Sequence, residues 1–130
     1  MDALEAMLAE REIGRMIVDY AAANDAGDWD AVAATYVEDG RMSRPTAPDA
    51  FIEGRAAILV AFNARPPRIT RHIVANIRVD VSDETACATS QILLFTAAGQ
   101  PPLVGSYHDK LVKTPHGWRF TERRGSLDFA

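Results

Sequence analysis

Cysteine and long apolar runs are what this sequence has least of. A single cysteine, Cys87, in 130 residues cannot form an internal disulfide or a thiolate metal cluster, which is typical of a reducing compartment. The longest apolar runs, such as Ile92 to Phe95, are far shorter than a membrane span, and residues 1–15 carry four acidic side chains without the apolar core of a signal peptide. We therefore expect a cytoplasmic protein that does not bind membranes.

Signatures of metal, nucleotide and acyl-transfer chemistry are also absent from the sequence. The three histidines, His72, His108 and His116, lack the close pairing of a zinc site. There is no glycine-rich phosphate loop and no G-x-S-x-G nucleophile elbow. A net charge of −4 argues against sequence-independent binding to nucleic acids. We expect no metal, no cofactor and no nucleic-acid partner.

The first half of the chain predicts three helices. Helical spacing of apolar residues starts near Ala3 and stops at Gly27, a residue type that commonly ends helices. Asp28 is a suitable N-cap for a short second helix. Its inward face would hold four residues, namely Trp29, Val32, Ala33 and Tyr36. Residues 40–50 contain two prolines and predict a short strand that runs into an irregular connection, followed by a third helix over residues 55–63.

The second half of the chain alternates as strands do. Four strands are predicted, joined by short segments that contain Gly, Pro, Ser or Asp: 68–81, 85–97, 103–113 and 118–128. Because strands follow the helices and do not alternate with them, we expect an α+β fold, a single domain over residues 1–130. Its strongly curved sheet, antiparallel or mixed, would wrap around the helices. On the first strand, one face is predicted to hold Ile69, Ile73, Ile77, Val79 and Val81.

Asp25 stands where a purely structural protein would avoid a carboxylate. The inward stripe of the first helix consists of Ile13, Ile17, Tyr20 and Asn24. Asp25 lies beside this stripe in the last helical turn, where an anion opposes the helix dipole and loses about 0.3 to 1 kcal/mol. A local rule broken in this way indicates a partner elsewhere in the chain or a functional site. The best candidate partner is His72.

His72 lies on the face opposite the isoleucines, together with Thr70, Val74 and Asn76. A histidine by itself is more often a structural residue, but Asp25 changes that interpretation. A buried carboxylate hydrogen-bonded to one imidazole nitrogen fixes the tautomer and leaves the other nitrogen free to take or give a proton. Such a pair works without a metal or a cofactor.

Three segments resemble the SnoaL-like branch of the NTF2-like (nuclear transport factor 2) superfamily: residues 20–30, 71–76 and 117–120. The resemblance covers essentially the whole chain. It implies a cone in which three helices and a bent sheet enclose one deep apolar pocket, and a homodimer formed through the outer face of the sheet. The strands here carry apolar side chains on both faces, which agrees with such a dimer.

Within that superfamily, Asp25 and His72 are similar to the catalytic aspartate and histidine of scytalone dehydratase-type enzymes. Two other positions of those enzymes, a tyrosine and a second histidine, correspond here to Asn24 and Phe95. Without that phenol and imidazole, dehydration of the same substrate is not implied, whereas proton transfer is. The resemblance therefore assigns a catalytic role to Asp25 and His72 alone.

Several neighbours are candidates for binding the substrate. Tyr20, Asn24 and Tyr107 would hydrogen-bond a carbonyl or enolate oxygen, or else would be buried with their polar atoms satisfied. Apolar walls would come from a further set, which would equally suit core packing: Met42, Phe62, Leu93, Phe95 and Trp118. Four arginines would either steer an anionic substrate or line a solvated strand edge: Arg65, Arg68, Arg71 and Arg78.

Two functions of different kinds follow from these observations. The first is a cofactor-independent lyase, dehydratase, isomerase or cyclase that moves a proton on a small apolar, aromatic or polyketide-like molecule. The second is a non-catalytic module that binds a small ligand or a partner, because one fold can serve both purposes. The enzyme is favoured because an apolar ligand does not need an ionised carboxylate beside a histidine. A small subunit of a ring-hydroxylating oxygenase is disfavoured, because no segment beyond the core elements remains for contact with a large partner.

Overall fold

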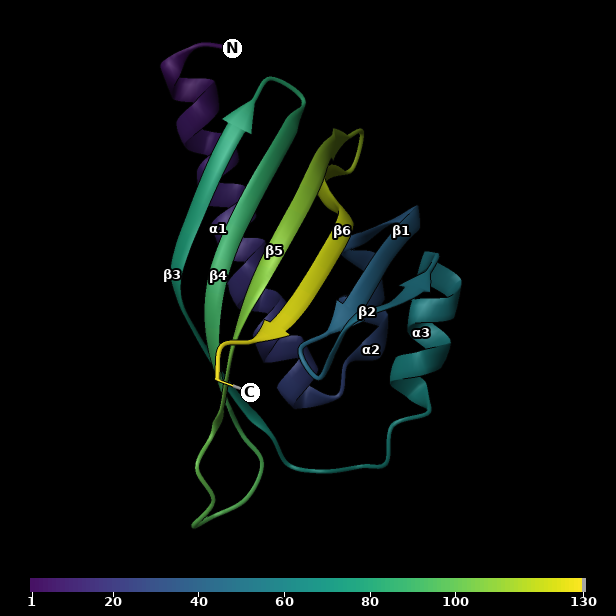
Figure 1. Cartoon of the computed structure of the whole chain (residues 1–130). Helices are drawn as coiled ribbons and strands as arrows, with labels where there is room; N and C mark the ends of the chain where they lie inside the picture. The colour runs from purple at the N-terminus through teal and green to yellow at the C-terminus, as the bar shows by residue number, and fades with distance from the viewer. Residues whose placement is uncertain (130) are drawn as a thin grey trace.

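The computed structural model describes residues 1–129 as one layer of helices against one curved sheet (Figure 1). The predicted α+β class is confirmed. The elements in chain order are α1 (Ala3–Ala26), α2 (Trp29–Ala34), β1 (Tyr36–Arg44), β2 (Ala47–Glu53), α3 (Arg55–Asn63), β3 (Arg71–Ser82), β4 (Thr85–Phe95), β5 (Leu103–Thr114) and β6 (Gly117–Leu127).

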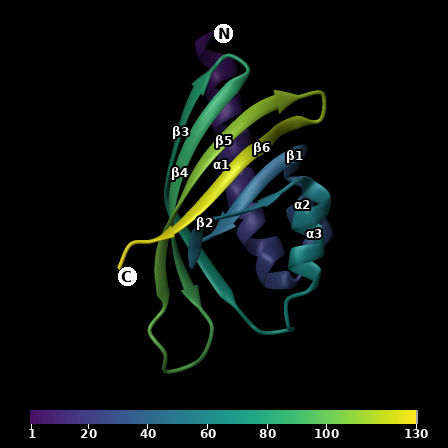
Figure 2. The ribbon, with the colours of Figure 1, turned by 45° about the vertical axis from the view of Figure 1, so that its right-hand side comes forward.

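The six strands form one open sheet in the order β2-β1-β6-β5-β4-β3. Every neighbouring pair is antiparallel except β1 and β6, which run parallel, so the sheet is mixed. The sheet curves around α1, while α2 and α3 lie on the side of β1 and β2 (Figure 2). None of the helices in residues 1–129 has the length and apolar character that a membrane span requires.

Helix α1 is fixed at both ends by local chemistry. Asp2 and Glu5 form a reciprocal capping box at its start, and Gly27 ends it in the left-handed conformation with φ of 70°. The predicted inward stripe is confirmed, because all four of its residues are buried against the sheet or the other helices: Ile13, Ile17, Tyr20 and Asn24. Burial of this stripe places the last turn of α1, with Asp25, beside the start of β3.

The segment between α2 and α3 differs from the prediction. Helix α2 ends at Ala34, and Tyr36 is already the first residue of β1, although its side chain is fully buried as expected. The residues expected to form an irregular connection instead form a hairpin of β1 and β2. The reason is long-range, because β1 gains its hydrogen-bond partners from β6, some 80 residues later in the chain.

Strand β3 also differs, because one extra residue interrupts its alternation. The pairing with β4 shifts between Ala75 and Arg78, and Asn76 adopts a positive φ of 53°. Because of this bulge, the residues that face inward before Asn76 are out of step by one with those that face inward after it. Ile69 and Ile73 are 89% and 47% exposed, respectively. His72 and Val74 therefore share the inner face with the three residues predicted to oppose them, Ile77, Val79 and Val81.

Candidate active site

Asp25 and His72 are in direct contact, as the sequence predicts. Nδ1 of His72 lies 2.5 Å from Oδ1 of Asp25, and the two side chains are only 9% and 16% exposed. An ionised carboxylate can only accept hydrogen bonds, so the proton of the neutral imidazole must lie on Nδ1. Nε2 then keeps a free lone pair. We refer to these two residues as the Asp25–His72 pair.

Two further hydrogen bonds hold the carboxylate of Asp25. The backbone N–H of His72 donates to Oδ2 at 2.8 Å, and the hydroxyl of Thr70 donates to Oδ1 at 2.9 Å. Together these donors compensate the unfavourable place of the anion at the C-terminus of α1. They also tie the end of the helix to the start of β3, so the position of the imidazole is set by two rigid elements.

His72 lines a cavity of about 390 Å³ on the inner side of the sheet, which we call the site cavity. Its apolar walls include Phe62 from α3, Ile92 and Leu94 from β4, and Leu103 from β5. Asp25 does not line this cavity, because it lies behind the histidine. Since Nδ1 faces Asp25, the Nε2 edge of the ring is the one left for a bound molecule.

The structure brings most of the predicted binding residues to the site cavity, namely Tyr20, Asn24, Met42, Phe62 and Tyr107. The prediction for Phe95 is wrong, because Phe95 and Leu93 lie on the outer face of β4 with 39% and 37% of their surface exposed. Leu94, one residue earlier than Phe95, provides the apolar wall instead. Trp118 is buried as expected but does not line the site cavity.

The tyrosines differ in how free their hydroxyls are. Tyr20 and Tyr36 share a buried hydrogen bond of 2.8 Å between their hydroxyls, so Tyr20 presents mainly its ring to the cavity. No side chain in residues 1–129 forms such a bond with Tyr107. Burial raises the pKa of Tyr107 to about 12, which keeps its phenol protonated near neutral pH. Tyr107 can therefore donate a hydrogen bond to an oxygen of a bound molecule.

Arg123 lies beneath the cavity and was missed by the sequence analysis. Its guanidinium is 3.9 Å from the ring centre of Tyr107 and 4.3 Å from that of Tyr20, and its Nε is 3.1 Å from Asp109. Strict alternation from the buried Phe120 would turn Arg123 outward. Thr121 is an extra residue in the pairing of β6 with β5, and this bulge turns Arg123 inward. The buried ion pair holds both tyrosine rings in place.

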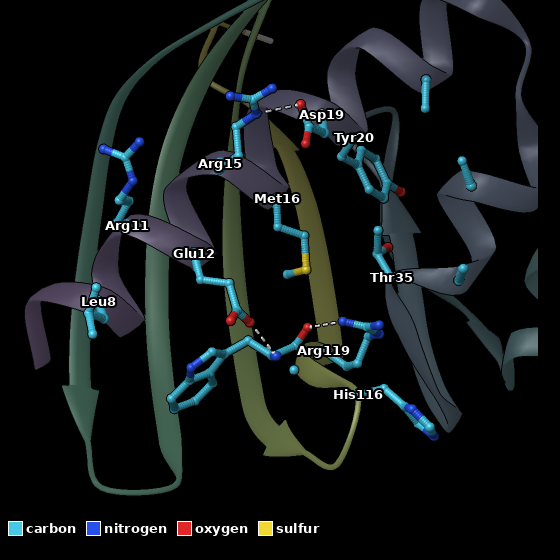
Figure 3. Close-up of a pocket in the computed structure, with 15 residues that line it drawn as sticks. Leu8, Arg11, Glu12, Arg15, Met16, Asp19, Tyr20, Thr35, His116 and Arg119 are labelled. Atoms are coloured by element: carbon cyan, nitrogen blue, oxygen red, sulfur yellow. Dashed lines mark hydrogen bonds and ion pairs between the residues drawn. The ribbon is translucent and has the colours of Figure 1, made fainter. Parts of the chain in front are cut away.

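A larger cavity, of about 680 Å³, lies on the other side of α1 (Figure 3). Both of its carboxylates are already engaged, because Asp19 pairs with Arg15 and Glu12 accepts the backbone N–H of Trp118. His116 extends away from both carboxylates (Figure 3). The larger cavity thus has no histidine–carboxylate contact, and the site cavity is the better candidate. In residues 1–129, no three His, Cys, Asp or Glu side chains converge as metal ligands.

Solved structures resemble this fold over nearly the whole chain. An NTF2-like protein with a cystatin-like fold from Novosphingobium aromaticivorans is 26% identical, with a TM-score of 0.87, and the match covers 98% of this chain and 87% of that one. A provisionally named scytalone dehydratase from the same species is 30% identical, with a TM-score of 0.79 and coverage of 97% and 86%.

A type 2 hexachlorocyclohexane dehydrochlorinase shares the fold at 15% identity, with a TM-score of 0.85 and coverage of 98% of this chain and 90% of that one. No protein of curated function matches the sequence significantly. The SnoaL-like domain family matches residues 5–124, which is most of the chain. The protein therefore belongs to the SnoaL-like family of the NTF2-like superfamily.

Proposed function

We propose that the protein is a cofactor-independent enzyme that transfers a proton on a small apolar molecule, aromatic or polyketide-like, as a lyase, dehydratase, isomerase or cyclase. The observation that carries the proposal is the Asp25–His72 pair at the wall of an apolar cavity, in which Nδ1 contacts the carboxylate and Nε2 has no hydrogen-bond partner among residues 1–129. The name of the 30% identical scytalone dehydratase and the family membership support a small-molecule enzyme of this kind.

In this proposal His72 is the general base and then the general acid. Nε2 removes a proton from an acidic C–H group, and the electron pair of that bond moves into the substrate. In an elimination, a C=C bond forms as the leaving oxygen departs, and the imidazolium gives its proton to that oxygen, so that water is released. In an isomerisation, the proton returns to another carbon. Asp25 orients the ring and stabilises the imidazolium.

Tyr107 and Asn24 are proposed to hold the substrate oxygen. Both line the site cavity beside His72, and burial raises the pKa of the Tyr107 phenol further above neutral pH. A hydrogen bond to a carbonyl stabilises the negative charge that grows on the oxygen when the neighbouring C–H loses its proton. Tyr20 serves as an apolar wall, since its hydroxyl is bonded to Tyr36.

A non-catalytic binding module is the second candidate, and one observation favours it. Asp25 also accepts bonds from Thr70 and from the backbone of His72, as a structural clamp between α1 and β3 would. In that case the imidazole of His72 would be a third hydrogen-bond donor to the Asp25 carboxylate, with a structural role only.

The two candidates are separated by exchange of substrate hydrogens. We expect the protein to catalyse exchange of acidic C–H hydrogens of some aromatic ketone, hydroxylated ring or polyketide-like compound with deuterated water. His72→Ala should lower this rate by about 10² to 10⁴, the usual contribution of general acid–base catalysis, with little change in affinity. His108→Ala is the matched control, because His108 is exposed on the outer face of β5. Binding without exchange in the wild type would favour the binding module.

We also propose that the chain acts as a single domain in the cytoplasm and forms a homodimer. The outer face of the sheet exposes a cluster of large apolar side chains, namely Ile73, Leu93 and Phe95. Ile73 and Leu93 are direct neighbours across β3 and β4. An exposed apolar surface of this kind is typical of an interface.

A further inference from the structure

The site cavity is lined by charges of one sign. Three arginines line it, Arg44 at the end of β1 and Arg65 and Arg68 in the connection from α3 to β3. No aspartate or glutamate among residues 1–129 lines the same cavity. The chain as a whole carries a net charge of −4, so these arginines are not part of a generally basic protein. We call them the arginine cluster.

Within the described part of the chain, the arginine cluster has no carboxylate partners, a property that it shares with several exposed arginines of this protein. Arg15, Arg41 and Arg124 each lie within 4.0 Å of an aspartate or glutamate oxygen. In residues 1–129 no such contact exists for Arg44, Arg65 or Arg68. The Nε atom of Arg44 is also buried and has no hydrogen-bond partner within that part of the chain. A buried donor without an acceptor is costly.

Arg65 is held in place by aromatic rings. Its guanidinium lies 4.4 Å from the ring centre of Phe62 and 5.9 Å from that of Trp29. Burial lowers the pKa of Arg65, and the positive charges of Arg44 and Arg68 lower it further. Arg44 and Arg65 are partly buried, whereas Arg68 is exposed. An anion beside Arg65 would offset both the repulsion from the other two arginines and the hydration that Arg65 has lost.

The other residues that line the site cavity indicate the chemistry of the rest of a bound anion. Phe62, Ile92, Leu94 and Leu103 provide apolar contacts, and His72 and Tyr107 provide polar groups. The β1–β2 turn and the α3–β3 connection lie toward the lower end of the molecule in Figure 1 and Figure 2. A molecule held there by its negative group would place an apolar body along the inner face of the sheet.

We propose that the substrate is an anion, namely a compound with an apolar ring-containing body and a carboxylate or similar oxyanion that Arg44 and Arg65 bind, with Arg68 as a third positive charge. This inference rests on the proposed function and names its substrate class. The same positive charges would also stabilise the negative charge that develops on the substrate when His72 removes a proton. Arginine suits the task because its planar fork can bind a carboxylate through two hydrogen bonds.

The test compares an acid with its neutral ester. We expect 2-naphthoate to bind the wild-type protein at least about tenfold more tightly than methyl 2-naphthoate in calorimetric titrations at low salt, since a hydrogen-bonded charge pair contributes roughly a factor of 10 to 100. High salt should reduce this preference, because it screens the partly exposed guanidinium groups. Arg44→Gln and Arg65→Gln should each weaken binding of the acid about tenfold and leave binding of the ester unchanged.

Two control variants sharpen the comparison. Arg78→Gln removes the same charge from the exposed outer face of β3 and should change neither affinity. His72→Ala should keep the preference for the acid while losing exchange activity, so failure of the proposed catalysis and failure of the arginine cluster give different results. Arg68→Gln replaces Arg65→Gln if the latter does not fold. An acid that binds no more tightly than its ester, including the case in which neither binds, overturns the proposal.

Discussion

Replacing Asp25 with asparagine should strongly lower the proposed activity by changing the tautomer of His72. The backbone N–H of His72 can only donate, so the amide oxygen of Asn must take the place of Oδ2 and accept that bond. The amide NH₂ then takes the place of Oδ1, where it faces Nδ1 of His72 and the hydroxyl of Thr70. Because NH₂ can only donate, Nδ1 must become the acceptor. The ring proton moves to Nε2, and the base loses its lone pair.

The size of the effect follows from this geometry. If the proton stayed on Nδ1, the Nδ1–H group and the amide NH₂ would be two donors facing each other without an acceptor. This arrangement costs about 1 to 3 kcal/mol for a buried group. The variant also lacks the negative charge that stabilises the imidazolium. Loss of the correct tautomer in a serine-protease triad lowers kcat about 10⁴-fold. Because Asp25 acts through His72, we expect a loss of about 10² to 10⁴ here, no larger than that of His72→Ala. The fold should be retained, because every hydrogen bond of the network can still be made.

Two measurements test Asp25→Asn. Nitrogen-15 NMR of the His72 ring should place the proton on Nδ1 in the neutral wild type and on Nε2 in the variant, whatever the substrate is. The deuterium exchange assay should give the predicted loss of rate. Asp19→Asn is the matched control, since Asp19 lies on the same helix and pairs only with Arg15 at the surface. A variant that keeps the proton on Nδ1, or retains more than about a tenth of the activity, would refute the reasoning.

Three other outcomes are expected. Tyr107→Phe should weaken both substrate binding and exchange rate, by about tenfold if one hydrogen bond is lost, and an unchanged rate would assign Tyr107 to the core. Burial raises the pKa of the Asp109 carboxyl to about 6 from an ordinary 3.8. The folded protein then binds this proton more tightly than the unfolded chain, so the free energy of unfolding should fall by up to about 3 kcal/mol between about pH 4 and 6. Denaturant titrations of wild type and Asp109→Asn should reveal this step only in the wild type, and a rise over that range would contradict it. Light scattering should find a dimer at micromolar concentration and a monomer for Phe95→Glu, whereas a monomeric wild type would exclude the proposed interface.

The Asp25–His72 contact could be predicted from the sequence because its position depends on regular structure. The 3.6-residue period of α1 places Asp25 beside a buried stripe, and residue type selects His72 as its partner. Phe95 could not be placed in the same way. Residues 92–95 are all apolar and by themselves do not show which face is buried. Leu94 points inward because the alternation of the earlier part of β4 continues without a bulge, which the sequence alone does not reveal.

The inward position of Arg123 and the β1–β2 hairpin could not be predicted from the sequence, for two different reasons. A single extra residue, Thr121, reverses the face on which Arg123 lies, and such bulges leave no clear mark in the sequence. The hairpin depends on the parallel pairing of β1 with β6, a contact between distant parts of the chain. Local propensity does not contain either kind of information.

The bulge at Asn76 makes the chemistry of this protein separable from its fold. Opposite Ser90 of β4, β3 contains two residues, and removal of one would restore a regular ladder. A one-residue slip turns a strand over, and the half after the bulge is fixed by its apolar contacts with the core. The half that contains His72 would therefore turn outward. If the proposed function holds, one deleted codon would remove the activity and keep the core, a short evolutionary step between catalytic and non-catalytic members of one fold.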